Sequence, residues 1–113
     1  MKTYPISRPD GTLLAFEVTS TWVTYRSLFR ILRAVEGVKS VRRKWFNEDR
    51  AEFLYLGEPC VVWEAWGDSN RYWIGPKEAE TSKLDVAPIH LAFQRHNGLW
   101  VRLWLAFHAK TGA

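Results

Sequence analysis

Residues 38–76 read VKSVRRKWFNEDRAEFLYLGEPCVVWEAWGDSNRYWIGP. Short apolar and aromatic runs alternate in this stretch with three polar clusters, at 47–50, 57–59 and 67–70. Apolar runs bounded by Gly, Pro, Asn, Asp and Ser are typical of antiparallel strands joined by tight turns. The stretch therefore predicts a four-stranded meander, with strands at 38–46, 51–57, 60–67 and 71–75.

The last two of these strands are apolar on both faces. Side chains alternate between the two faces of a strand. In the strand 60–67, one face bears Val61, Trp63 and Ala65, and the other bears Cys60, Val62, Glu64 and Trp66. In the strand 71–75, Tyr72 and Ile74 lie on the face opposite Arg71 and Trp73. A sheet with two apolar faces either has helices on both faces or uses one face for binding. The sequence leaves these alternatives open.

A hairpin is predicted before the meander. Segments 3–7 and 12–19 flank Arg8-Pro9-Asp10-Gly11. Proline presets the first dihedral angle of a turn, aspartate bonds to its own backbone and glycine accepts a left-handed conformation.

Two helices are predicted. Apolar residues recur every three or four positions over 22–36 and then stop at Gly37, a residue suited to the position after a helix. A second helix is expected over 86–97, with Asp85 as its N-cap and Pro88 in its first turn. The apolar edge of this second helix comprises Val86, Ile89 and Phe93.

The order of these elements indicates one α+β domain over residues 1–113 with an antiparallel sheet. We expect both helices to pack on the meander, in a split-βαβ (ferredoxin-like) arrangement with an inserted hairpin and an extra N-terminal arm. Segment 99–107 alternates apolar and polar residues, which favours a strand over a helix.

The composition is that of an ordinary globular protein, with 47% hydrophobic and 25% charged residues among 113. The single cysteine, Cys60, excludes an internal disulfide framework and a cysteine-cluster zinc site. No apolar segment follows the N-terminus as in a secretory signal, and none has the length of a membrane span. We therefore expect a cytoplasmic protein that has no membrane partner and no cofactor.

Protein recognition is the function that the sequence favours. Seven Trp and four Tyr residues, together with a run of arginines, match the residue types enriched in interface cores. The sequence thus predicts a non-catalytic binding protein with a protein partner, or one that self-associates as a dimer. The residues predicted for that surface are Trp45, Trp66, Trp73, Arg42, Arg43 and Arg71.

Nucleic-acid binding is the alternative. Residues 26–50 contain eight basic and three acidic side chains, whereas 51–80 contain two basic and six acidic ones. Cations interleaved with aromatic residues suit single-stranded RNA or DNA, because cations bind the phosphates and aromatic rings stack on unpaired bases. The residues predicted for this function are Arg26, Arg30, Arg33, Arg42, Arg43 and Lys44.

An enzyme is the third alternative. The sequence has no glycine-rich phosphate loop, no nucleophile motif and no histidine pair at metal-binding spacing. Glu64 and Asp68 flank Trp66 and could act as an acid–base pair if a pocket enclosed them. With no stronger motif, the sequence favours a protein without catalytic or metal-binding residues.

Overall fold

The structure, a computed structural model, describes residues 3–19, 25–43, 49–64 and 71–95. Within these ranges the chain forms six strands and two helices. They are β1 (Thr3–Ser7), β2 (Leu13–Thr19), α1 (Tyr25–Ala34), β3 (Val38–Arg43), β4 (Asp49–Tyr55), β5 (Glu58–Trp63), β6 (Arg71–Pro76) and a helix at 87–95.

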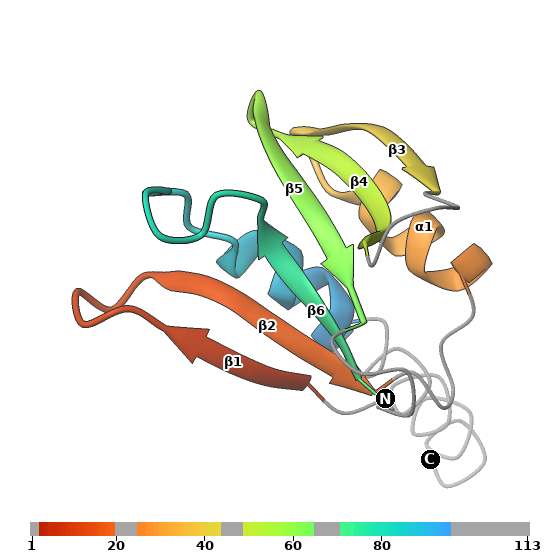
Figure 1. The fold of residues 1–113 in the computed structure, drawn as a ribbon. Coiled ribbons are helices and arrows are strands. Elements are labelled where there is room, and N and C mark those ends of the chain that lie inside the picture. The colour runs from red at the N-terminus through yellow and green to blue at the C-terminus, as the bar shows by residue number, and fades with distance from the viewer. Residues whose placement is uncertain (1–2, 20–24, 44–48, 65–70, 96–113) are drawn as a thin grey trace, which may run out of the picture.

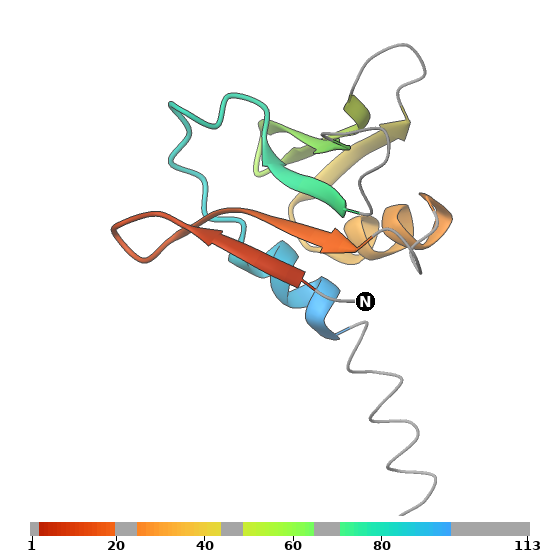
Figure 2. The same ribbon diagram turned by 60° about the horizontal axis from the view of Figure 1, so that its bottom comes forward.

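All six strands belong to one antiparallel sheet with the order β1-β2-β6-β5-β4-β3. The two helices lie on the same face of this sheet, α1 behind β3 and β4 and the helix at 87–95 behind β2 and β6 (Figures 1 and 2). We call this covered side the inner face and the opposite side the outer face. The prediction of a small α+β domain with an antiparallel sheet is confirmed.

The meander is confirmed as β3-β4-β5-β6, but its strand ends differ from the prediction. The turn between β4 and β5 comprises Leu56 and Gly57, so Glu58 and Pro59 belong to β5 rather than to a loop. Both turn residues have positive φ angles, 52° and 83°. These are the values of a type I′ turn, which joins antiparallel strands with only two residues.

The split-βαβ arrangement is not confirmed. The two strands that α1 connects, β2 and β3, are separated in the sheet by β6, β5 and β4. The reason is that four consecutive strands pair as neighbours, and the last of them, β6, then pairs with β2. Segment 99–107, expected to be a strand, lies outside the described residues.

The predicted helix at 22–36 is seen as α1, which ends earlier, at Ala34. Residues 20–24 lie outside the described part of the chain. Gly37 lies three residues beyond the end of α1 rather than directly after it, but its φ of 93° is the left-handed value that the prediction requires. Leu28 and Leu32, on the apolar side of α1, are fully buried in the core.

The turn predicted at 8–11 forms as the residue types require. The Asp10 carboxylate accepts hydrogen bonds from the backbone N–H of Thr12 at 2.9 Å and from its hydroxyl at 2.6 Å, which lowers the pKa of Asp10. Gly11 has a φ of 92°. The Arg8 guanidinium donates to the carbonyl oxygens of Leu84 at 2.8 Å and Ser82 at 2.9 Å, and so ties the hairpin to the segment before the second helix.

The second helix begins at residue 87 and is described as far as 95. The Asp85 carboxylate accepts hydrogen bonds from the backbone N–H groups of Ala87 at 3.0 Å and Leu13 at 3.1 Å. The predicted cap thus satisfies one helix donor and also joins the helix to β2. Ile89 and Phe93 are fully buried, as the periodicity predicts.

His90, on this helix, predicts a pH dependence of stability. Its Nε2 lies 3.0 Å from the Thr3 hydroxyl of β1, its ring packs on Phe16, and partial burial lowers its pKa below 6.5. The unfolded chain then binds a proton more readily than the folded one, so stability is complete above about pH 6.5 and falls as the pH drops toward the folded pKa. Urea unfolding at about pH 7.5 and about pH 5.5 should show this loss.

The control is His90→Gln, which keeps a hydrogen-bonding side chain but cannot titrate in this range. Its unfolding free energy should depend less on pH over the same interval. An equal pH dependence in both proteins would assign the effect to other groups.

Candidate functional site

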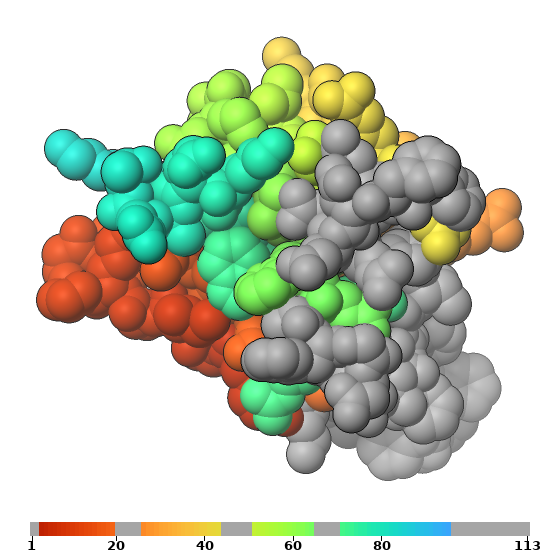
Figure 3. All heavy atoms as spheres, viewed as in Figure 1, coloured from red at the N-terminus to blue at the C-terminus, as the bar shows by residue number. Residues whose placement is uncertain are grey.

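The outer face of the sheet bears a row of partly exposed side chains. Strand register brings Tyr4 of β1 opposite Glu17 of β2, Glu17 opposite Trp73 of β6, and Trp73 opposite Trp63 of β5. We call Tyr4, Trp73 and Trp63 the aromatic row. In Figure 3, which views this face, atoms of β1, β2, β5 and β6 are visible at the surface.

Two contacts hold the aromatic row in place. The Trp63 and Trp73 rings meet edge to face, with 6.5 Å between centroids and 79° between planes. The guanidinium carbon of Arg71 lies 3.8 Å from the centre of the Tyr4 ring. An edge-to-face pair and a cation over a ring each contribute about 0.5–1 kcal/mol at a partly exposed site. The row is therefore ordered without being fully buried.

Gly75 explains why Trp73 can lie close to the sheet. A Cβ atom at Gly75 would be 2.8 Å from Cη2 of Trp73 and 2.7 Å from Cβ of Ala15 on β2. The absence of a side chain thus leaves room for the indole next to β2. A large aromatic group whose position is already fixed loses little entropy when a partner binds.

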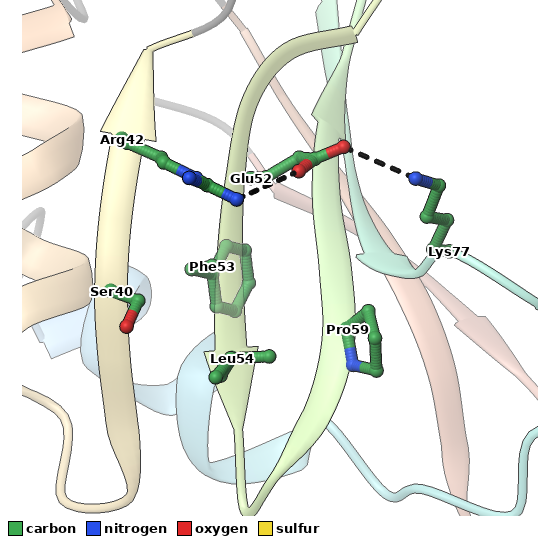
Figure 4. Close-up of a pocket in the computed structure, with 7 residues that line it drawn as sticks. All are labelled: Ser40, Arg42, Glu52, Phe53, Leu54, Pro59 and Lys77. Atoms are coloured by element: carbon green, nitrogen blue, oxygen red, sulfur yellow. Dashed lines mark hydrogen bonds and ion pairs between the residues drawn. The ribbon is translucent and has the colours of Figure 1, made fainter.

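A charged pocket of about 340 Å³ lies on the same face, over β3, β4 and β5 (Figure 4). It is lined by Ser40, Arg42, Glu52, Phe53, Leu54, Pro59 and Lys77.

Glu52 is the centre of this pocket. Its side chain is only 16% exposed, and its carboxylate forms ion pairs with Lys77 Nζ at 3.2 Å and with Arg42 Nη2 at 3.9 Å. Lys77 and Arg42 remain 50% and 72% exposed. One carboxylate therefore lies beneath two cations that retain solvent-facing donors, and the three groups carry a net charge of +1.

A β-bulge positions Arg42. The register of β3 against β4 shifts between Lys39 and Arg42, and Ser40 within the bulge has a φ of 56°. Bulges redirect side chains, and a non-glycine residue at positive φ is held there at a cost. After the shift, Arg42 is the partner of Glu52 in the register.

The structure brings together only some of the residues that the sequence predicts for a protein interface. Trp73, Arg71 and Arg42 share the outer face. Arg43 does not, because it is the register partner of buried Ala51 and adjacent residues of a strand point to opposite faces. Trp45 and Trp66 lie outside the described residues.

The residues predicted for nucleic acid are also divided. Arg26, Arg30 and Arg33 are exposed on α1, on the helix side of the sheet, and Arg33 donates to the Val41 carbonyl oxygen at 3.4 Å. Arg42 lies on the opposite side of the sheet. Lys44 lies outside the described residues. The basic segment is therefore not one basic surface in the part of the chain that the structure describes.

Sequence reasoning missed Tyr4, Glu17, Glu52 and Lys77. Tyr4 and Lys77 come from distant parts of the chain, and only the pairing of β1, β2 and β6 places them on the outer face. The alternation within 60–67 predicts the face of Trp63 correctly, because Val62 is buried on the inner face. That pattern was the available signal for including Trp63 in the site.

Of the predicted acid–base pair, Glu64 is partly exposed and Asp68 lies outside the described residues. The same part of the chain contains no group of three or more His, Cys, Asp or Glu side chains that could hold a metal ion. Cys60 is buried in β5, and burial raises the pKa of its thiol to about 12. A thiol with such a pKa is a poor nucleophile at neutral pH.

Comparison with protein-family models, with curated proteins and with solved structures finds no match to this chain. No helix within the described ranges is both long and apolar enough to cross a membrane. The fold and the outer face define a small α+β protein with an ordered, partly exposed aromatic surface.

Proposed function

We propose that this chain is an intracellular, non-catalytic binding protein that recognises a partner protein through the outer face of its sheet. The observation that carries the proposal is the Trp63–Trp73 pair, packed edge to face and only partly buried. Tryptophan, tyrosine and arginine are the side chains that most often dominate protein interfaces. Here Arg71 and Tyr4 extend the pair along the same face.

The charges on the outer face favour a protein partner over a nucleic acid. Glu17 lies between Tyr4 and Trp73, so a polyanion bound along the aromatic row would meet a carboxylate. Mixed charges around an apolar centre suit a protein surface, where they set orientation and exclude wrong partners. The arginines of α1 cannot add to this face from the other side of the sheet.

The charged pocket gives the proposed interface a polar end. Arg42 and Lys77 have solvent-facing donors and a surplus positive charge over Glu52. We propose that this pocket receives a carboxylate of the partner while the aromatic row contacts an apolar segment. The charged pocket and the aromatic row would together fix the orientation of the partner on the outer face.

A crosslinking experiment tests this proposal. A photoreactive amino acid replaces Glu17, which lies between Tyr4 and Trp73, and a second protein carries it at Arg30, exposed on α1. We expect the probe at position 17, but not the one at 30, to crosslink one partner protein in cells. In the purified complex, Trp73→Ala should weaken binding about tenfold or more, the loss typical of an interface anchor.

Arg30→Ala is the matched control and should leave affinity unchanged, since it removes an exposed arginine from the helix side. Circular dichroism must show that the Trp73→Ala variant is folded. Equal crosslinking from both positions, or unchanged affinity of the folded Trp73→Ala variant, would reject the outer face as the interface.

Nucleic-acid binding through the partly exposed aromatic row is the second candidate, favoured by Arg71, whose guanidinium lies over the Tyr4 ring. It is tested by titrating mixed single-stranded RNA and DNA oligonucleotides at low and near-physiological salt, with tryptophan fluorescence as the signal. Binding that quenches tryptophan and weakens steeply with salt would favour this candidate over a protein partner.

A further inference from the structure

A second hollow, of about 650 Å³, lies on the helix side of the molecule and is independent of the outer face. It is formed by the end of α1, the β4–β5 turn and the helix at 87–95. Its lining residues are Ala34, Val35, Glu36, Tyr55, Leu56, Pro88, Leu91, Ala92 and Arg95. We call it the apolar groove. Among the described residues, the two exposed large apolar side chains, Leu56 (67% exposed) and Leu91 (45%), both belong to it.

Leucine is an unfavourable residue for the turn position that Leu56 occupies. It is the first residue of a turn with type I′ φ values, where asparagine or aspartate is preferred before glycine. Leucine at a positive φ is uncommon and strained, and a side chain that remains 67% exposed adds little stability through its contact with Gly37. Contact with a binding partner would explain why a strained, exposed leucine lies at this hollow.

The rim of the apolar groove carries one charge of each sign. Glu36 follows α1 and Arg95 belongs to the second helix, and both are exposed. Neither forms an ion pair with another residue in the described part of the chain. In a twofold-symmetric interface, residue i of one copy meets residue j of the other and j meets i. One acid and one base on a single patch satisfy that condition.

We infer that the apolar groove binds a second copy of this chain in a twofold-symmetric dimer. Leu56 of each protomer enters the groove of the other and contacts the region of Leu91 and Ala92. Glu36 of each protomer pairs with Arg95 of the other. The patch offers an exposed leucine at the edge of a hollow and carries one charge of each sign, so a second copy can supply a partner for each of these groups.

Sedimentation equilibrium over the micromolar range, with the 113-residue chain, tests this inference. Wild type should show a concentration-dependent dimer. The dissociation constant of the Leu56→Asn dimer should be at least tenfold higher than that of wild type. The same substitution should leave the thermal midpoint of the monomer unchanged or higher, because asparagine suits the turn. Loss of the dimer would then not come from misfolding.

Charge reversal tests the pairing of the two protomers. Glu36→Arg and Arg95→Glu should each weaken the dimer, and the protein carrying both changes should recover it, because the two ion pairs form again with reversed polarity. Glu80→Arg, a reversal at an exposed site outside the groove, should have no effect. A monomeric wild type, a dimer that survives Leu56→Asn, or no recovery in the doubly reversed protein would overturn the inference.

Discussion

Phe93→Ala is expected to lower the free energy of unfolding by about 3–5 kcal/mol, the cost of removing a large buried aromatic side chain. Phe93 is fully buried, and its ring lies 5.3 Å from that of Phe16 on β2. It therefore joins the second helix to the inner face of the sheet. Since small domains are stable by only about 5–15 kcal/mol, this loss would approach the limit of stability. Urea unfolding monitored by circular dichroism measures it.

Gln94→Ala is the matched control, because Gln94 is the exposed neighbour on the same helix. It should change the unfolding free energy by no more than about 0.5 kcal/mol. If Phe93→Ala also cost less than about 1 kcal/mol, the second helix would not be part of the core. The apolar groove, which this helix helps to form, would then lose its support as well.

Local patterns in the sequence predicted the helices and turns because the forces that form them are local. The spacing of Val86, Ile89 and Phe93 is a helical period, and all three are buried. Gly37 and Gly11 adopt the left-handed conformations that their positions require. The turn between β4 and β5 was predicted at 57–59 instead of at Leu56 and Gly57, because leucine before glycine breaks the usual preference for Asn-Gly.

The order of the strands could not be read from local patterns. The pairing of β2 with β6 joins residues more than fifty positions apart, such as Phe16 and Ile74. No turn residue signals such a contact, which depends on how the whole inner face buries its apolar side chains. A split-βαβ plan and the observed order have the same local patterns, so the sequence did not separate them.

The candidate site was predicted in part for the same reason. Alternation within a single strand correctly places Arg71 and Trp73 together on the side opposite Tyr72. The aromatic row, however, is assembled across strands, and Tyr4 joins it only through β2. Arg42 and Arg43 look like a pair in the sequence, yet as neighbours in a strand they face opposite ways.

Gly75→Ala is expected to destabilise the protein by up to about 3 kcal/mol, in the range found when extra atoms are forced into a packed site. The new Cβ would lie 2.7 Å from Cβ of Ala15 and 3.2 Å from the Leu14 carbonyl oxygen, and neither atom can rotate away. Either β2 and β6 separate slightly or the Trp73 ring is displaced. Urea unfolding measures the cost, and near-ultraviolet circular dichroism detects displacement of the ring.

Exchange of the two residues provides the control. In the Ala15→Gly, Gly75→Ala protein the Cβ atom moves from β2 to β6, so the closest of the contacts is removed and part of the stability should return. The contact with Trp73 remains in this protein. Its near-ultraviolet spectrum should therefore still differ from that of wild type. If Gly75→Ala changed neither stability nor spectrum, Trp73 would not be packed against the sheet, and the aromatic row would lose the order on which its proposed role depends.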